Sequence, residues 1–252
     1  MAGEYAGTEV SIIGVMVEEE ALKFEKSLEP FEEATGIDIV YEPTKEFEAV
    51  INVRIDAGDP PDVANFSQPG FVANLARTES LYDVSEFLGE EWLQQQYNQG
   101  WLDMATMAGA DGEDVAGGVW HRTSAKSYVW YPKQPFEAAG YELPTTWDEM
   151  LALTDQIVAD GDAPWCIGIE SGAATGWVAT DWMENIMLRT TSPENYDKWV
   201  SNELKFSSPE VKGAAEKMAE LWLNEDYVYG GTAAIVSTFI GDSPVPMFED
   251  PP

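Results

Sequence analysis

Three side chains between residues 177 and 182 have the chemistry of a carbohydrate site. Trp177 and Trp182 carry large apolar ring faces, and Asp181 places a hydrogen-bonding carboxylate in the same stretch. A flat apolar ring beside a carboxylate suits a sugar, which has apolar faces and a rim of hydroxyl groups. The alternative is that the tryptophans are core residues and that Asp181 only stabilises a helix N-terminus through the helix dipole.

A strand and a loop of small residues precede these side chains. The apolar run 165–169 predicts a buried strand, and a helix is expected to begin near Thr180 or Asp181. In an open α/β sheet, ligands bind beyond the carboxyl ends of the strands. This order of elements therefore predicts that Trp177, Asp181 and Trp182 lie at a ligand-binding edge.

The first part of the chain also alternates strands and helices. The predicted elements are strands through 10–15, 37–41 and 62–66, and helices that end at Gly36 and Gly58. This is the order of a largely parallel sheet. Glu19, Glu20 and Gln68 follow two of these strands, so they are expected at one sheet edge, although acids in a first helical turn also suit the helix dipole.

Other local patterns indicate structure rather than chemistry. Thr146 and Glu149 form a capping box that starts a helix ending at Gly161, and Pro209 opens a further helix. Residues 81–107 are predicted to be helical and to serve packing. The acidic stretch 111–114 lacks the ligand spacing of a calcium loop and is interpreted as a solvated hairpin.

The charge balance excludes several classes of partner. The chain has 46 acidic residues against 13 basic ones, for a formal net charge of -33. Such a field repels nucleic acid and anionic membranes, so neither is expected as a partner, and a soluble monomer is favoured. A salty environment would screen the self-repulsion. No apolar run approaches the roughly 20 residues that span a bilayer.

Cysteine and histidine are too scarce for most catalytic and metal chemistry. Cys166 excludes an internal disulfide, and its place in an apolar run favours an inert thiol. His121 is the single histidine, which argues against His-rich zinc sites and leaves one candidate base for a catalytic triad. No metal, cofactor or catalytic residue is expected.

Two of the few basic residues lie where the chain passes between two predicted domains. Residues 120–131 are expected to be extended, and the composition before and after them restarts an α/β pattern. The predicted organisation is a disordered leader over 1–8, an N-terminal α/β lobe over 9–124 and a second α/β lobe over 125–252. Arg122 and Lys126 are expected to pair with carboxylates or to donate to a polar ligand, with surface salt bridges as the alternative.

Several short stretches carry a resemblance to one family. They are residues 31–36, 58–63, 68–70, 126–127, 129–131, 144–149, 164–189, 230–232 and 246–252. On these pieces the chain resembles the extracellular solute-binding proteins of sugar-importing ABC transporters, and it looks most like the alpha-glucoside-binding branch. The stretch from Trp165 to Arg189 is the most specific of them.

The resemblance implies a two-lobed, periplasmic-binding-protein-like (type II) fold with hinge strands, which closes over an oligosaccharide without catalysis. The implied partners are a sugar and the membrane permease subunits, and the implied location is periplasmic or extracellular, with lipid anchoring of a full-length form left open. The implied cleft residues are Glu19, Glu20, Gln68, Lys126, Trp130, Trp177 and Asp181; Arg122 and Trp182 join them from the residue-level reasoning.

Members of this family continue well beyond the Pro-Pro at which this sequence stops. The first lobe is therefore expected to be incomplete, because the continuation returns to it. Two alternatives remain open: a carbohydrate-active enzyme, since tryptophan beside acids also describes a glycosidase cleft, and an inert truncated fragment. Failure to turn over a bound sugar would discriminate the receptor from the enzyme.

Overall fold

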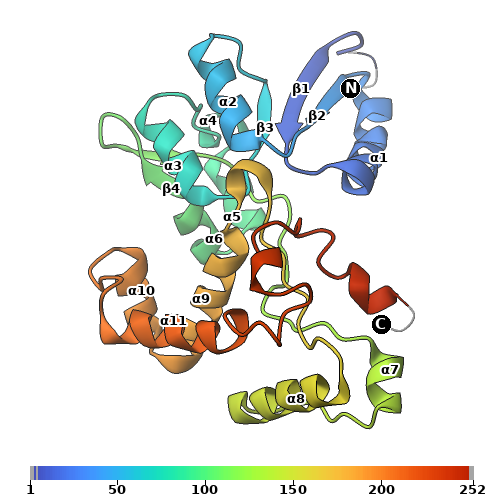
Figure 1. The fold of residues 1–252 in the computed structure, drawn as a ribbon. Coiled ribbons are helices and arrows are strands. Elements are labelled where there is room, and N and C mark those ends of the chain that lie inside the picture. The colour runs from blue at the N-terminus through green and yellow to red at the C-terminus, as the bar shows by residue number, and fades with distance from the viewer. Residues whose placement is uncertain (1–2, 4, 250–252) are drawn as a thin grey trace. The chain divides into compact units, whose positions relative to one another are not determined.

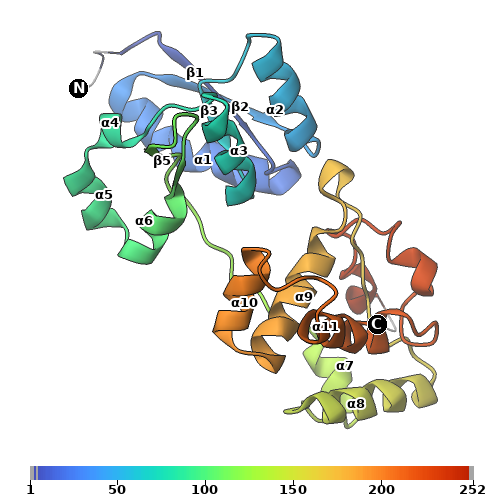
Figure 2. The same ribbon diagram turned by 90° about the vertical axis from the view of Figure 1, so that its left-hand side faces the viewer.

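The computed structural model describes residues 3 and 5–249 of the chain. It divides into two compact units, unit 1 (Met1–Ser124) and unit 2 (Ala125–Pro252), whose elements are labelled in Figures 1 and 2. Part of the expected leader, residues 1–2 and 4, lies outside the described residues. Within the rest of it, Gly7 N donates to Gly36 O at 3.3 Å and Asp38 N donates to Thr8 O at 2.8 Å. Ordered structure therefore begins earlier than residue 9.

Unit 1 is organised around a parallel three-stranded sheet in the order β2–β1–β3. Its first elements are β1 (Glu9–Gly14), α1 (Glu18–Thr35), β2 (Asp38–Pro43), α2 (Phe47–Asp56), β3 (Val63–Asn65) and α3 (Pro69–Arg77). In this register Ile12 lies opposite Tyr41 on one side and Val63 on the other. The predicted alternation of strands and helices is confirmed, and the third strand is shorter than expected.

The two faces of this sheet carry separate core clusters because successive side chains of a strand point to opposite faces. Ile12 packs with Met16, Ala21 and Tyr41, so α1 covers one face. Ile13 packs with the α2 residues Phe47 and Ile51, so α2 covers the other face, as Figure 1 shows. These apolar contacts fix the direction in which the strands end.

The rest of unit 1 is more broken than the sequence predicts. Its elements are α4 (Ser85–Leu88), α5 (Glu90–Gln96), α6 (Gln99–Ala105), β4 (Thr106–Ala108) and β5 (Asp114–Ala116). Gly89 has a φ of 75° and Tyr97 is extended, so the expected continuous helical region is interrupted twice. β4 and β5 pair antiparallel around residues 109–113, which confirms the predicted hairpin.

Unit 2 is mainly helical. Its elements are α7 (Lys133–Ala138), α8 (Trp147–Asp160), η1 (Gly172–Ala174), α9 (Trp177–Thr190), α10 (Pro193–Val200), α11 (Pro209–Trp222), η2 (Thr232–Ala234) and η3 (Val245–Phe248). The capping box is confirmed: Glu149 N donates to Thr146 Oγ1 at 3.2 Å, and the Glu149 carboxylate accepts from Thr146 N at 3.1 Å. Gly161 ends α8 in the left-handed region, also as predicted.

The strand predicted over residues 165–169 is reduced to two isolated parallel bridges. Trp165 pairs with Val228, and Glu170 pairs with Phe239. Between these two points the partner segment turns through Gly230 and η2, so its backbone cannot stay parallel to residues 166–169. Among the described residues of unit 2 no regular strand forms, and the sheet expected there is replaced by helices packed around the two bridges.

The core of unit 2 consists of two clusters, one at each end of α11. Leu221 and Trp222 pack with Ile167, Val228 and Ile235, together with partly buried residues of α8. Near the start of the helix, Val211 and Ala214 pack with Met183, Ile186 and Met187 of α9. Figures 1 and 2 both show α9 and α11 side by side. α9, which carries the proposed site, is therefore held by buried contacts along its length.

The segment 117–132, which the structure describes throughout, carries no regular secondary structure. Hinge strands were expected here, but this segment is coil because its backbone is not paired with a neighbouring strand. In the part of the chain that the structure describes, none of the helices combines the length and the apolar character needed to cross a membrane.

Candidate functional site

The first two turns of α9 carry Trp177, Asp181 and Trp182. The helix starts at Trp177, three to four residues earlier than predicted, because Gly176 adopts a φ of 107° and its carbonyl accepts from Ala179 N and Thr180 N. Glycine is the residue that reaches this backbone conformation without strain. Asp181 therefore lies in the second turn, so the alternative that it only stabilises the helix N-terminus is wrong.

Trp177 and Asp181 share one face of α9, because residues four apart on a helix are neighbours. Lys126 reaches this face from the coil before α7. Its ammonium nitrogen lies 2.8 Å from Asp181 Oδ2 and 4.7 Å from the centre of the Trp177 ring. The structure thus brings Lys126 to two other predicted site residues that lie more than 50 positions away in the sequence. We call Lys126, Trp177 and Asp181 the α9 cluster.

The coil that carries Lys126 is held in an unusual conformation. Ser127 has a φ of 69°, a left-handed value that costs free energy for a residue other than glycine. Trp130 follows on the same coil, 77% exposed, and its ring packs edge-on against Tyr128 at 6.2 Å. Trp130 thus presents an exposed indole on the same coil, four residues after Lys126.

Trp182 occupies a different environment from Trp177. Its ring lies between Trp165 and Trp222, at 5.9 Å and 5.6 Å from their centres, and it borders both core clusters of unit 2. The core interpretation therefore describes Trp182, and its expected place beside Asp181 in a ligand site is corrected. The helical period explains the difference, because positions five apart point away from each other.

The remaining predicted residues lie in unit 1, where β1 and β3 end. Glu20 pairs with Arg122 at 3.8 Å, and Glu19 pairs within its helix with Lys23 at 3.7 Å. Gln68 is the exposed residue that precedes α3, three positions after the end of β3. The structure therefore pairs Arg122 with a carboxylate, as expected, while Glu19 and Glu20 both lie in the first turn of α1, where the helix-dipole alternative also places them.

His121, next to Arg122, contacts one residue of β3 and one residue of α1. Its Nε2 makes a short contact with the Asn65 side-chain amide, and its ring lies 6.1 Å from that of Phe24. Burial lowers the pKa of His121, and the positive charge of Arg122 lowers it further. The imidazole is therefore neutral at pH 7, so it can donate a hydrogen bond from one ring nitrogen and accept one at the other.

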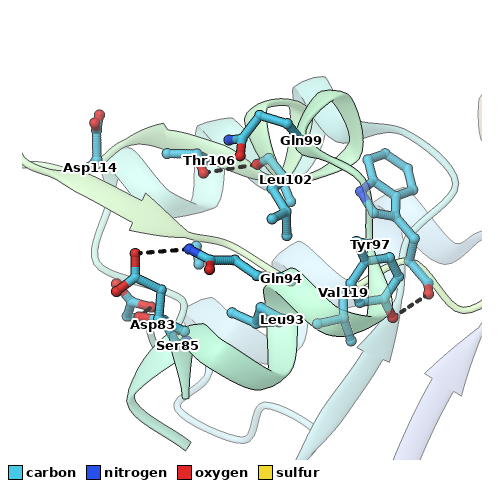
Figure 3. Close-up of a pocket in the computed structure, with 15 residues that line it drawn as sticks. Asp83, Ser85, Leu93, Gln94, Tyr97, Gln99, Leu102, Thr106, Asp114 and Val119 are labelled. Carbon is cyan, nitrogen blue, oxygen red and sulfur yellow. Dashed lines mark hydrogen bonds between the residues drawn. The ribbon is translucent and has the colours of Figure 1, made fainter. Parts of the chain in front are cut away.

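A hollow in unit 1, which the sequence reasoning missed, is drawn in Figure 3. It has a volume of about 370 Å³ and is lined by residues of α4, α5, α6 and the β4–β5 hairpin. Many of its polar groups are already used: Tyr97 donates to Trp120 O at 2.7 Å, and Thr106 donates to Leu102 O at 2.9 Å. The apolar pattern of residues 81–107 predicts packed helices, and it does not indicate that a space remains between them.

A second hollow, of about 380 Å³, lies in unit 2 beside the cysteine. Cys166 is half-buried, and burial raises the pKa of its thiol, so the neutral form prevails at pH 7. This environment supports the interpretation of Cys166 as an inert residue. Within residues 3 and 5–249, no group of three or more His, Cys, Asp or Glu side chains is arranged to hold a metal ion.

Comparison with known sequences decides the family. Residues 15–241, most of the chain, match the model of the bacterial extracellular solute-binding protein family. This chain belongs to that family. The Osmoprotective compounds-binding protein GgtB of Synechocystis is 46% identical over 250 residues, covering 99% of this chain and 58% of the relative. The Alpha-glucosides-binding periplasmic protein AglE of Rhizobium meliloti is 42% identical, covering 98% of this chain and 54% of the relative.

Both relatives are longer proteins, and this chain spans a little over half the length of each. A solved structure of a sugar transporter from Arthrobacter chlorophenolicus A6 with bound laminaribiose has a TM-score of 0.64 and 17% sequence identity, covering 96% of this chain and 59% of the other. At this identity the similarity concerns the fold alone. It confirms the predicted periplasmic-binding-protein-like α/β fold, although the second unit is richer in helix than expected.

Proposed function

We propose that the protein to which this chain belongs binds an alpha-glucoside or a similar oligosaccharide, without catalysis, and delivers it to the membrane permease subunits of an ABC importer. Membership of an extracellular solute-binding family supports a binding role outside the cytoplasmic membrane. The names of the two relatives, which are an osmoprotective compounds-binding protein and an alpha-glucosides-binding periplasmic protein, support the ligand class and a periplasmic location.

The observation that carries this proposal is the α9 cluster. The Trp177 ring provides an apolar face on which a sugar ring can stack. Asp181 accepts hydrogen bonds from hydroxyl groups, and the Lys126 ammonium donates to hydroxyl oxygens. The Lys126 and Asp181 side chains are 54% and 29% exposed, so both are reachable from solvent while being held by their 2.8 Å contact.

Trp130 extends the same proposal, because its exposed ring follows Lys126 by four residues. In unit 1 the proposed ligand contacts are Glu20, Arg122 and Gln68, with Glu19 beside them. The Glu20–Arg122 pair offers both an acceptor and planar guanidinium donors. Each of these contacts is testable by substitution, independently of the α9 cluster.

Calorimetric titration of the chain with maltose, trehalose, sucrose and palatinose, with product analysis of each mixture, tests the proposal. We expect one or more of these sugars to bind and to be recovered unchanged. Trp177→Ala should abolish binding, whereas Trp177→Phe, which keeps an aromatic face, should retain a weaker affinity. Hydrolysis of a bound sugar would favour the carbohydrate-active enzyme instead, and absence of binding to all four would contradict the proposal for this chain.

A further inference from the structure

The ammonium group of Lys126 occupies the place that a cationic ligand would take. Proteins recognise quaternary ammonium compounds with the face of an aromatic ring, and carboxylates add electrostatic attraction. In the α9 cluster both elements are present, in Trp177 and Asp181, and both already contact Lys126 Nζ, at 4.7 Å and 2.8 Å. The chain's own cation therefore fills this position.

The Lys126–Asp181 pair differs from the other ion pairs of unit 2. Among the described residues of this unit, Lys133–Glu137 and Lys212–Glu216 are pairs within a single helix, at 3.8 Å and 3.4 Å, with every side chain at least 63% exposed. Lys126 and Asp181 are 55 positions apart, their contact is shorter, and the Asp181 side chain is 29% exposed. The left-handed backbone of Ser127 adds a local constraint on the direction of Lys126.

We propose that Lys126 is a specificity-determining residue that makes this site select uncharged polyhydroxy ligands over cationic or zwitterionic osmoprotectants. The inference rests on the proposed function and narrows its ligand class. A chain with a net charge of -33 attracts cations in general. Lys126 neutralises Asp181 and covers one face of Trp177, while the remaining N–H groups of its ammonium can donate to hydroxyl oxygens.

The charges around Asp181 explain why loss of Lys126 should turn the α9 cluster into a site for cationic ligands. Glu184, one turn farther along α9, accepts a hydrogen bond from the Tyr196 hydroxyl at 3.1 Å. Burial and then the charge of Glu184 raise the pKa of Tyr196 to about 12, so the phenol stays a neutral donor. Removal of Lys126 would leave Asp181 without its 2.8 Å ammonium partner and the Trp177 ring without its cation, with the Glu184 carboxylate one turn away on the same helix.

The test compares the native chain with Lys126→Met, which removes the charge and keeps the length of the side chain. Lys133→Met is the matched control, because it makes the same charge change on an exposed helical pair of the same unit. Choline chloride and glycine betaine are titrated into each protein at constant ionic strength, with trehalose as the uncharged probe. Near-ultraviolet circular dichroism checks that the three proteins keep the same fold.

We expect Lys126→Met to bind choline at least about tenfold more tightly than the native chain does, with no gain in Lys133→Met. Equal choline binding by the native chain and Lys126→Met would overturn the inference, as would an equal gain in the control. Native binding of choline as tight as that of trehalose would overturn the inference and leave the proposed function standing. The choline comparison uses no sugar, so it tests the exclusion of cations by Lys126 separately. Failure of all four sugars to bind would contradict the proposed function and the polyhydroxy preference that rests on it, whereas a choline gain in Lys126→Met would still support cation exclusion.

Discussion

Truncation of the two tryptophans of α9 should lower the stability of the chain by very different amounts. Trp182 makes edge-on contacts with two other indoles, at 5.9 Å and 5.6 Å, and borders two buried clusters. Truncation of a buried tryptophan typically costs 3–5 kcal/mol, and each aromatic pair contributes about 0.5–1.5 kcal/mol beyond burial. Since Trp182 is half-buried, we expect Trp182→Ala to lower the free energy of unfolding by about 3 kcal/mol.

Truncation of Trp177 should lower the free energy of unfolding far less than truncation of Trp182. Neither of the core clusters described for unit 2 includes it. Its ring lies 4.7 Å from the Lys126 ammonium, an interaction of about 0.5–1 kcal/mol at a solvent-accessible position. Trp177→Ala should therefore lower the free energy of unfolding by less than about 1 kcal/mol while removing sugar binding.

Urea unfolding followed by far-ultraviolet circular dichroism separates the two outcomes. With a denaturant dependence of about 1–3 kcal/mol per molar, Trp182→Ala should lower the unfolding midpoint by about 1 M or more, and Trp177→Ala by a fraction of that. Equal losses of stability for the two variants would refute the placement of Trp177 on a ligand-facing surface. A larger loss for Trp177→Ala would refute the packing argument for Trp182 as well.

Three further results are expected. Thr146→Ala removes the hydroxyl that caps α8 and should lower the free energy of unfolding by about 1 kcal/mol in urea melts, whereas Thr146→Ser should retain most of it. Burial lowers the pKa of His121, so below about pH 6.5 the unfolded chain binds more protons than the folded chain and stability should fall as the pH drops. His121→Gln should flatten this part of a plot of the urea unfolding midpoint against pH. An unchanged plot would contradict the burial of a neutral His121. With a net charge of -33, the melting temperature should rise between 0.1 M and 1 M NaCl as the screening length shortens from about 10 Å to about 3 Å, and a fall would show that self-repulsion is not limiting.

Elements with local start and stop signals were predictable from the sequence. The capping box of Thr146 and Glu149, the proline at the start of α11 and the glycine after α1 act through residues within one helical turn. The alternation of strands and helices in unit 1 was predictable for the same reason, because apolar spacing is a property of each segment.

Features that depend on distant partners were not predictable in this way. The run 165–169 has the composition of a strand, but its partner between residues 228 and 239 turns away, so only two bridges form. The start of α9 depends on a left-handed Gly176, which is a weaker signal than a side-chain cap. Residue types did identify Lys126 and Asp181 separately, although their mutual contact across 55 positions could not be read from either segment.

The scarcity of basic residues gives their positions meaning. With 13 basic against 46 acidic residues, almost any lysine can find a carboxylate within its own helix, as Lys133 and Lys212 do. A pair within one helix does not hold that helix to another part of the chain, and exposed ion pairs contribute little to stability. Lys126 instead joins a coil without regular structure to the second turn of α9, and it takes a half-buried carboxylate and an indole face as its partners. This placement favours a role in the ligand site over a role in general surface stability, since a surface role would not require contacts so far apart in the sequence.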